Sequence, residues 1–394
     1  MKFSQDRILT THCGSLPRPA DLITTLHAKD AGQNYDRATF EREVAKSVAD
    51  VVARQIALGV DVVNDGEHSK SNFAMYGRMR LNGIENVDKG VTFRGPTRDM
   101  LAFPDVYEEA TRMNAARDSE GSVRRRLLMP ATVCAGPISY AGQKDVATDI
   151  AYLKSALQGR KAEEAFITAI SPTNLELYHR NEYYRTDEEY LEALANAMNV
   201  EYRAIVDAGF LLQIDDPRLA THYNRTPDIT VEEARKFIAL RVETVNHALK
   251  GIPREKVRFH TCYSVNIAPR VHDMELKHYL DLMLRINAQA FSFEASNPRH
   301  EHEWAVWKDA KIADDIILVP GVVSHCLHLV EHPELVAQRL ERYASFVGRE
   351  RVMASNDCGF ATSAAGDEVH PDVAWAKMEA LSEGARIASA RLWN

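Results

Sequence analysis

The sequence lacks any apolar run that approaches the roughly 20 residues a helix needs to cross a bilayer. Its first residues, MKFSQDRILTTHCGS, also lack the apolar core of a secretory signal peptide. Pro-rich or Ser-rich linkers and low-complexity tracts are missing as well. From these absences we expect a cytoplasmic protein without membrane attachment, folded as one elaborated domain over residues 1–394.

The sequence has few cysteines and no excess of basic charge. The 394 residues include five cysteines, an odd and sparse set that does not suit a disulfide framework. Thiols in a reducing compartment are instead available as metal ligands. The formal net charge of −8 and a pI near 6.0 argue against a nucleic acid or an anionic membrane as the partner. A homo-oligomer is compatible with this composition.

Nine short apolar runs recur along the chain, and each ends in a polar or glycine-rich cluster. Helical patterns such as FEREVAKSVADVVARQIALG lie between them, and this alternation predicts a parallel sheet with helical crossovers. Eight such strands close an α/β (β/α)8 TIM barrel with loop insertions. We assign the surplus run, FITAISP at residues 166–172, to the outside of the barrel. The nine runs are RILTTHCGS, VDVVNDGE, LLMPATVCAGP, FITAISP, FLLQIDDP, VRFHTCYS, AFSFEAS, ILVPGVVS and VMASNDCG.

Two stretches interrupt the alternation and are expected to be excursions from the barrel, at residues 85–126 and 171–187. The first is charged and shows little periodicity. The second, SPTNLELYHRNEYYRTD, contains Tyr183 and Tyr184, which would form either a lid or an aromatic loop packed on the barrel. We favour the packed loop.

Chemically active side chains follow most of the predicted strands. In a (β/α)8 barrel the carboxyl ends of the strands share one face, and active sites lie there. We therefore expect the functional site at this face. The strand-end residues are His12, Glu67, Asp215, His260, Glu294 and Cys358.

The run RFHTCYS predicts a metal site. His260 and Cys262 are two residues apart, so on a strand their side chains point the same way. Glu294 comes 34 residues after His260, and Cys358 comes 64 residues after Glu294, which is about one and two barrel repeats. One nitrogen and two thiolates suit zinc, and a carboxylate as fourth ligand would be exchangeable.

The alternative is that Cys262 and Cys358 are small buried side chains without a ligand role. An H-x-C pair alone is a weak signal. Its coincidence with Glu294 and with the D-C-G motif at 357–359, all at predicted strand ends, favours the metal. The other thiols are not expected to bind it: Cys13, Cys134 and Cys326.

In these residues the chain resembles the cobalamin-independent methionine synthase family. The resemblance is to the family's catalytic barrel only. The blocks THCGSLPRP, VDVVNDGE, CAGPISY, LQIDDP, HTCYS, FEAS, VPGVV and NDCG follow the family's order, over about residues 5–390. The longer blocks GPISYAGQ, SNPRHEHEW and VPGVVSHCLHLVEHPELVAQRL look most like the branch of epoxyalkane:coenzyme M transferases, the 2-hydroxypropyl-coenzyme M lyases.

The resemblance implies a (β/α)8 barrel and a substrate thiol bound to zinc as the thiolate. It places zinc, the expected cofactor, on His260, Cys262, Glu294 and Cys358.

The same resemblance implies where the thiol substrate's amino acid end binds. It places that end against Gly14 and Ser15, with Glu67 and Asp215 facing the ammonium group. Backbone N–H groups at a glycine turn suit a carboxylate, and carboxylates at strand ends can pair with an amine. The alternative role of the two acids is to anchor loops or cap helices.

The chain also departs from methionine synthases. The stretch GPISYAGQKD offers Tyr140 and Gln143 where methionine synthases have a tryptophan that stacks on the folate. The N-terminal half that helps hold polyglutamyl folate is missing too. These departures argue against direct use of methylfolate and leave a corrinoid-bound methyl group or an epoxide as the electrophile.

Further candidates follow the later strands. In SNPRHEHEWAVW, Arg299 could bind an anionic group, and His300 or His302 could protonate an alkoxide. The alternative is a salt-bridged loop that leads into a helix. His325 ends the run VPGVVSH and is a third catalytic candidate, and Asp357 could orient a zinc-binding histidine.

Together these residues predict a zinc-dependent thiol S-alkyltransferase whose partners are a small-molecule thiol and an alkyl donor. We favour methyl transfer to homocysteine or a related thiol, because Glu67 and Asp215 can hold its amino group. The first alternative is addition of a thiol to an epoxide. A non-catalytic zinc-binding barrel would need four firm protein ligands, and a decarboxylase resembling uroporphyrinogen decarboxylase would not need the H-x-C pair.

Overall fold

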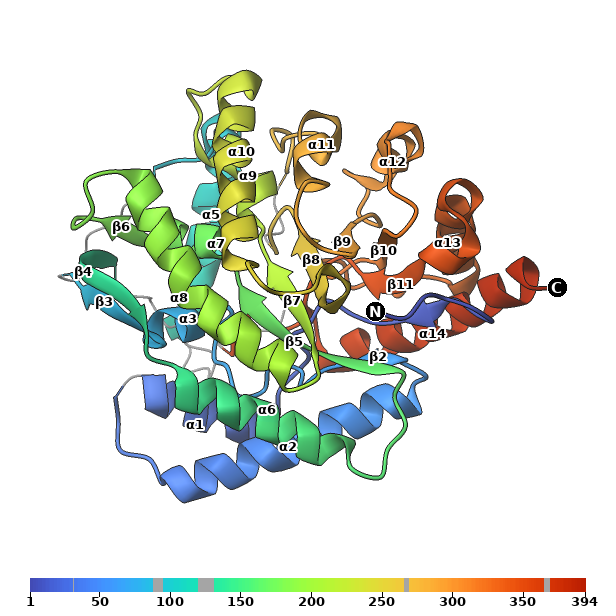
Figure 1. The fold of residues 1–394 in the computed structure, drawn as a ribbon, viewed down its shortest axis with the longest axis horizontal. Coiled ribbons are helices and arrows are strands. Elements are labelled where there is room, and N and C mark those ends of the chain that lie inside the picture. The colour runs from blue at the N-terminus through green and yellow to red at the C-terminus, as the bar shows by residue number, and fades with distance from the viewer. Residues whose placement is uncertain (31, 88–94, 120–130, 266–268, 365–368) are drawn as a thin grey trace.

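Eight short parallel strands form the central sheet (Figure 1). They are β1 (Leu9–Thr10), β2 (Val62–Val63), β5 (Glu164–Ile170), β7 (Leu211–Asp215), β8 (Val257–Thr261), β9 (Ala290–Glu294), β10 (Ile317–Val323) and β11 (Met353–Asn356). Their order around the sheet is β1-β11-β10-β9-β8-β7-β5-β2, with parallel pairing throughout. The computed structural model describes residues 1–30, 32–87, 95–119, 131–265, 269–364 and 369–394.

Hydrogen bonds between the two end strands bring the sheet round into a barrel. Asp61 N, just before β2, donates to Thr10 O of β1 at 3.1 Å. Thr11 Oγ1 donates to Val62 O at 3.0 Å. The predicted (β/α)8 barrel is confirmed.

Apolar side chains fill two separate layers of this barrel. One cluster comes mainly from the first residues of the strands and includes Leu9, Val62, Phe166, Leu211 and Met353. Because successive side chains of a strand point to opposite faces, these residues fill the interior, and their neighbours pack against the helices in the larger core. The barrel is therefore packed at its amino end, which leaves its carboxyl end for a site.

Amphipathic helices surround the strands, with α8 beside α10 and α13 beside α14 (Figure 1). Side-chain caps begin several of them: Thr186 accepts from Glu189 N at the start of α8, and Thr230 and Glu233 form a capping box at the start of α10. The longer helices are α1 (Ala20–Asp30), α2 (Arg37–Ala57), α5 (Pro104–Ser119), α6 (Gln143–Leu157), α8 (Asp187–Asp207), α10 (Val231–Ala248), α13 (Pro333–Val347) and α14 (Pro371–Leu392).

Shorter helices occupy the loops between these elements. The α-helical ones are α3 (Met75–Met79), α4 (Arg98–Ala102), α7 (Pro172–Tyr178), α9 (Arg218–Arg225), α11 (Leu280–Met283) and α12 (Trp304–Asp309). The 3-10 turns are η1 (Arg254–Lys256), η2 (Leu276–His278), η3 (Glu301–Glu303) and η4 (Arg349–Arg351).

One strand assignment made from the sequence is wrong. The run FITAISP lies in β5, inside the barrel, between β2 and β7. The strand outside the barrel comes from LLMPATVCAGP: β4 (Thr132–Tyr140) joins β3 (Leu81–Asn86) and β6 (His179–Asn181) in a three-stranded sheet. The second half of β4 alternates between exposed and half-buried residues, as a strand covered on one side does, whereas FITAI is continuously buried.

The two predicted excursions contain secondary structure of their own. Residues 171–187 include α7 and β6, and Tyr184 packs against α8, its ring stacked on Tyr190 with 5.8 Å between centroids. Tyr183 is 51% exposed. Within 85–126, the end of β3 and helices α4 and α5 are seen, while residues 88–94 and 120–126 lie outside the described residues.

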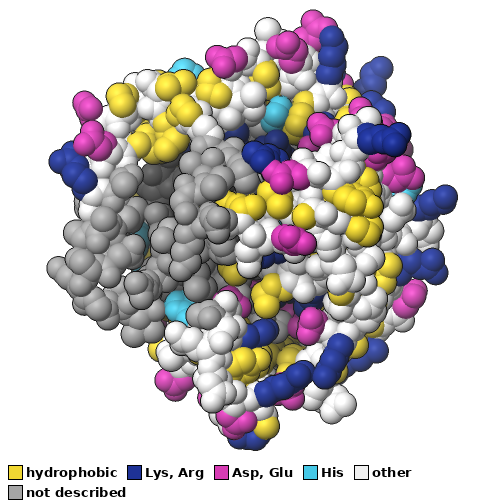
Figure 2. Space-filling model, turned by 90° about the vertical axis from the view of Figure 1, so that its left-hand side faces the viewer, with side chains coloured by type: hydrophobic (Ala, Val, Ile, Leu, Met, Phe, Trp, Pro, Cys, Tyr) yellow, Lys and Arg dark blue, Asp and Glu magenta, His cyan; other side chains and the backbone are white. Residues whose placement is uncertain are grey.

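One face of the molecule carries mixed charge. Acidic and basic side chains are interspersed on the face shown in Figure 2, and neither sign forms a continuous field there. Among the described residues, no helix has both the length and the apolar character required to cross a membrane.

The free energy of unfolding can test whether FITAISP forms a strand of the barrel. Phe166 is 0% exposed, and Arg258 lies over its ring at 4.1 Å. Phe166→Ala should lower the free energy of unfolding by about 3–5 kcal/mol, because it leaves a cavity in the barrel interior. Urea unfolding would measure this, with Leu329→Ala as the control, since Leu329 is 78% exposed. Equal stabilities for the two variants would contradict an interior β5.

Candidate metal centre and substrate pocket

Strand register brings the predicted site residues to one level of the barrel. In the parallel pairing, Asp215 of β7 lies opposite His260 of β8, and His260 lies opposite Ser292 of β9. Glu294, two residues further on β9, lies opposite Gly321 of β10. These residues therefore share the carboxyl face where the sequence predicted a site.

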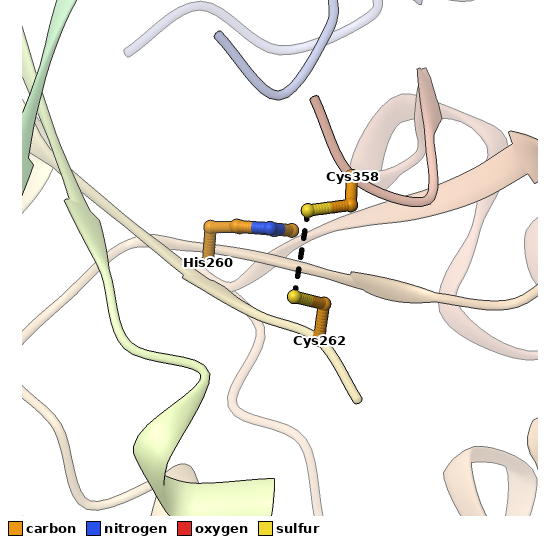
Figure 3. A group of neighbouring side chains, drawn as sticks. All are labelled: His260, Cys262 and Cys358. Atoms are coloured by element: carbon orange, nitrogen blue, oxygen red, sulfur yellow. Dashed lines mark hydrogen bonds between the residues drawn. The ribbon is translucent and has the colours of Figure 1, made fainter. Parts of the chain in front are cut away.

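Three donor atoms converge at this face. His260, Cys262 and Cys358 each offer one ligand atom, and these atoms lie within 4.8 Å of one another. The two Sγ atoms are 3.4 Å apart, and the imidazole of His260 points toward them (Figure 3). All three residues are buried. The structure thus brings together three of the four predicted metal ligands.

The hydrogen bonds of His260 suit a metal ligand. Its Nδ1 lies 3.3 Å from Ser292 Oγ and 3.6 Å from Cys13 Sγ. Its Nε2 is buried and has no hydrogen-bond partner within the part of the chain that the structure describes. A neutral ring with its proton on Nδ1 would leave the Nε2 lone pair free for a metal, with Ser292 and Cys13 fixing the ring orientation.

The two thiols also suit a metal. The hydrogen bond from Cys358 Sγ and the nearby His260 lower the pKa of Cys262, while the same contact raises the pKa of Cys358. One sulfur of the pair therefore ionises readily, as ligation requires. One nitrogen and two sulfurs form a donor set that zinc favours.

The fourth predicted ligand, Glu294, lies outside this group. Arg270 Nη1 contacts both of its carboxylate oxygens, at 3.0 and 3.3 Å, and Asn297 Nδ2 donates to Oε2 at 3.0 Å. Burial raises the pKa of Glu294, whereas the positive charge of Arg270 lowers it. The structure therefore pairs this carboxylate with Arg270 and leaves it outside the group of three donors.

A cavity of about 230 Å³ opens directly onto the three donors. The predicted substrate residues Ser15, Glu67 and Asp215 line it together with His260, Cys262 and Cys358. The metal group and the acidic residues thus share one pocket.

Gly14 allows the first loop to pass close to Glu67. Its φ is 129°, and a Cβ at this position would lie 2.6 Å from Glu67 Oε1 and 2.8 Å from Thr168 Cγ2. Its N–H donates to His12 Nδ1 at 3.2 Å, so this backbone group, which the sequence assigned to a substrate carboxylate, already has an acceptor. Ser15, the next residue, lines the pocket.

Two buried carboxylates lie next to each other in the pocket. Glu67, with φ at 59°, accepts from Thr168 Oγ1 at 3.0 Å, and Asp215 Oδ1 accepts from Gln213 Nε2 at 2.7 Å. Burial raises the pKa of Asp215 to about 7, and the nearby Glu67 adds to this effect while His260 opposes it. A cation placed between these two carboxylates would stabilise the ionised form of both.

Comparison with known proteins places the chain in a family. The family model for the catalytic domain of cobalamin-independent synthase matches residues 8–140 and 175–381. The chain belongs to this family. A methionine synthase of Sulfurisphaera tokodaii is 25% identical over 386 residues, which cover 98% of this chain and 94% of the relative. A methionine synthase of Thermococcus kodakarensis is 25% identical over 355 residues, covering 89% and 86%.

Solved structures of the family share the fold. A B12-independent methionine synthase from Shewanella sp. W3-18-1, in complex with selenomethionine, has a TM-score of 0.71 at 17% identity and covers 98% of this chain and 99% of its own. A putative B12-independent methionine synthase from Listeria monocytogenes has a TM-score of 0.65 at 18% identity, with the same coverage. These likenesses confirm the barrel. The epoxyalkane branch stays a prediction that no comparison confirms.

Four other predicted residues do not reach the pocket as described. Arg299 donates to the backbone oxygens of Arg270 and Val271, and His302 is exposed at the surface. His325 is fully buried, with Nδ1 3.8 Å from Glu294 Oε1. His300, the fourth, is buried in a separate network. Catalytic roles for the three histidines stay predictions.

Some pocket residues were missed from the sequence. Thr221 and Arg225 line the pocket from α9, and Asn174 and Tyr178 line it from α7. Thr221 and Arg225 are four residues apart on one helix, so they share a face. The helix directly follows the DDP motif at a strand end, and that position could have drawn attention to them.

The metal group predicts which cysteines the protein needs in order to retain zinc. Cys262→Ser or Cys358→Ser should each reduce bound zinc from one per chain to near zero after dialysis against a weak chelator, because hydroxyl oxygen is a poor replacement for a thiolate. Metal analysis by mass spectrometry would measure the loss. Cys326→Ser, which changes a half-buried thiol outside the group, is the matched control and should keep its zinc. Full zinc in a folded Cys262→Ser protein would contradict the assignment.

The network around His300 predicts a pH-dependent stability. His300 stacks on Tyr263 with 3.5 Å between centroids, and its ring nitrogens lie 3.1 Å from Glu303 Oε2 and 3.1 Å from Asp273 Oδ2. Burial disfavours the imidazolium, but the hydrogen bonds to Asp273 and Glu303 outweigh burial and raise the pKa of His300 to about 9. This stabilisation should be fully present below pH ~6.5, the unfolded pKa, and should be lost as the pH rises through about 9.

His300→Gln should therefore lower the free energy of unfolding at pH 6 by on the order of 3 kcal/mol, and the difference from wild type should shrink by pH 9.5. Urea unfolding at several pH values would show this. His302→Gln, at the exposed neighbour, should produce no such pH-dependent difference. A His300→Gln difference that stays constant over this range would argue that His300 is neutral in the folded protein.

Proposed function

We propose that this protein is a zinc-dependent methyltransferase that methylates the thiol of homocysteine or of a closely related amino acid. One observation carries the proposal: a single pocket contains the His260, Cys262 and Cys358 donors together with two buried carboxylates. A zinc ion on these donors would lower the pKa of a coordinated thiol, so that the thiol binds as the thiolate near neutral pH. Membership in the methionine synthase family supports this reading.

The chain's own residues would orient the substrate through its amino acid group. Glu67 and Asp215 line the pocket, and in the described part of the chain their carboxylates accept hydrogen bonds from the neutral side chains of Thr168 and Gln213. An ammonium in the pocket would stabilise the ionised form of both. Ser15 Oγ offers a donor for the substrate carboxylate on the same side. The thiol end would then extend toward Cys262 and Cys358, which line the same cavity.

The other walls of the pocket are suited to exclude water from the methyl carbon. Phe73, Leu177, Tyr178 and Val265 contribute apolar surface around the donors. A pocket with low water content strengthens charge interactions and holds the two reactants in alignment. A pocket beside the donors also distinguishes this site from a structural zinc site, which is closed by four protein ligands.

Homocysteine binding tests whether Glu67 and Asp215 bind the ammonium group of the substrate. Glu67→Gln or Asp215→Asn in the zinc-loaded protein should weaken homocysteine binding by about 1–3 kcal/mol each, the usual cost of losing a charge-assisted hydrogen bond. Binding of coenzyme M, a sulfonate thiol without an ammonium group, should be unchanged or improved, because the carboxylates repel it. Isothermal titration calorimetry with both thiols would measure the two effects.

Asp216→Asn is the matched control, because Asp216 is a buried carboxylate engaged by Thr173 and Asn174 and is outside the described pocket lining. It should change homocysteine binding by less than about twofold if the fold is intact. A wild-type protein that ignores homocysteine but joins coenzyme M to an epoxide would overturn the methyl-transfer assignment in favour of the epoxide alternative.

A further inference from the structure

Lys70 is a buried lysine whose charge is not paired directly with a carboxylate. It is 2% exposed, and among the described residues no carboxylate oxygen lies within ion-pair distance of its Nζ. Nζ donates instead to Thr168 O at 2.6 Å and to Thr168 Oγ1 at 3.1 Å, and it lies over the ring of Tyr76, 4.3 Å from the centroid. Lys70 therefore acts on its surroundings mainly through Thr168.

The direction of the Thr168 hydroxyl follows from these contacts. An ammonium group only donates hydrogen bonds, so Oγ1 must accept from Lys70. The single hydroxyl proton is then available for Glu67 Oε1, which lies 3.0 Å from Oγ1. Lys70, Thr168 and Glu67 thus form a relay with one hydrogen-bond direction, and it ends on a carboxylate that lines the pocket.

This relay engages one oxygen of Glu67 and leaves the other to the pocket. Gly14 closes the side of Oε1, where a Cβ would lie 2.6 Å from this oxygen. In the part of the chain that the structure describes, no hydrogen bond reaches Oε2. Because Glu67 lines the cavity, Oε2 is the oxygen that a ligand can contact.

The backbone of Glu67 is fixed by other contacts. Its φ of 59° lies in the left-handed region that residues other than glycine seldom adopt. Arg18 Nη2 donates to Glu67 O at 2.9 Å, and Glu67 N donates to Asp65 Oδ1 at 3.0 Å. These contacts do not set the rotation of the carboxylate. Thr168 Oγ1 is the donor that sets it.

The hydroxyl between Lys70 and Glu67 also determines how much charge the carboxylate offers. A lysine in direct contact would form an ion pair with Glu67 and compete with a cationic ligand for it. With the hydroxyl in between, Lys70 directs the hydrogen bond and leaves Glu67 without a bound cation. A binding group held in one orientation before the ligand arrives lowers the cost of binding.

We propose that Thr168 is a positioning residue for substrate recognition: its hydroxyl, directed by Lys70, binds Oε1 of Glu67 and turns Oε2 toward the ammonium group of the thiol substrate. This inference rests on the proposed function, because it requires an amino acid thiol in the pocket. Neither Lys70 nor Thr168 belongs to the described lining of the pocket or to the metal group. Both therefore act through Glu67.

The test compares two thiols that differ only in the ammonium group, homocysteine and 4-mercaptobutanoate. Calorimetry on the zinc-loaded protein would give the ratio of their Kd values in wild type, Thr168→Val and Thr168→Ser. Valine has the shape of threonine without the hydroxyl, whereas serine keeps the hydroxyl. Thr244→Val is the matched control, because Thr244 is also buried but its hydroxyl donates to Leu240 O on α10, outside the described pocket lining.

Wild type should bind homocysteine more tightly than 4-mercaptobutanoate. Thr168→Val should reduce this preference at least about fivefold, because Glu67 loses the donor that orients it. Thr168→Ser and Thr244→Val should change the preference by less than about fivefold, since each keeps the hydroxyl that binds Glu67. All variants should retain zinc as wild type does.

Given a wild type that prefers homocysteine, two results would overturn the inference alone. One is a folded Thr168→Val protein whose preference falls by less than about fivefold, and the other is a Thr168→Ser protein whose preference falls by that much or more. Should Thr168→Val not fold, a crystal structure of wild type with homocysteine decides: the substrate nitrogen should contact Oε2 of Glu67, and contact with Oε1 would overturn the inference. A wild type that binds both thiols equally would refute the ammonium site of the proposed function, and the inference with it.

Discussion

Parallel pairing of β8 with β7 on one side and β9 on the other fixes the level at which the site forms. His260 lies between Asp215 and Ser292 in this register, so the acidic side of the pocket, the imidazole and the serine that contacts its ring are set by one pattern of backbone hydrogen bonds. A slip of one residue in β8 would turn His260 and Cys262 toward the helices. Val257 and Phe259, which alternate with the inward-facing residues of β8, oppose such a slip because it would turn them away from the larger apolar core.

The region around the site is rich in buried charge, and each acid has a different arrangement. Glu294 faces Arg270, Asp357 accepts backbone and hydroxyl hydrogen bonds, and Glu67 and Asp215 face the pocket. Buried carboxylates are costly unless they are paired or hydrogen-bonded. The first two arrangements are complete within the protein. The third is the one that a cationic ligand would complete, which is why substrate recognition is assigned to it.

Residues whose placement follows from strand periodicity could be predicted from the sequence. The i, i+2 spacing of His260 and Cys262 and the strand-end position of Cys358 led directly to the observed group. The same rule located Glu294 but could not identify its partner, because Arg270 lies in a turn 24 residues earlier whose shape depends on long-range contacts. For His300 and His302, composition suggested chemistry, but their orientation depends on the 3-10 turn η3 and its packing. FITAISP was assigned to the wrong sheet for a similar reason: an apolar run alone does not indicate which elements will pack against it.

The pairing of the first barrel strand with the last, Leu9 with Met353, has a consequence for the protein's synthesis. The sulfurs of Cys262 and Cys358 are 96 residues apart, and the pocket combines Ser15 near the start of the chain with Thr362 near its end. A nascent chain that has not yet emerged past β11 has an open barrel and offers only two of the three donors, His260 on β8 and Cys262 directly after it. Such contacts between distant parts of a chain form late in folding. Firm retention of the metal would then mark the chains that have finished both translation and folding.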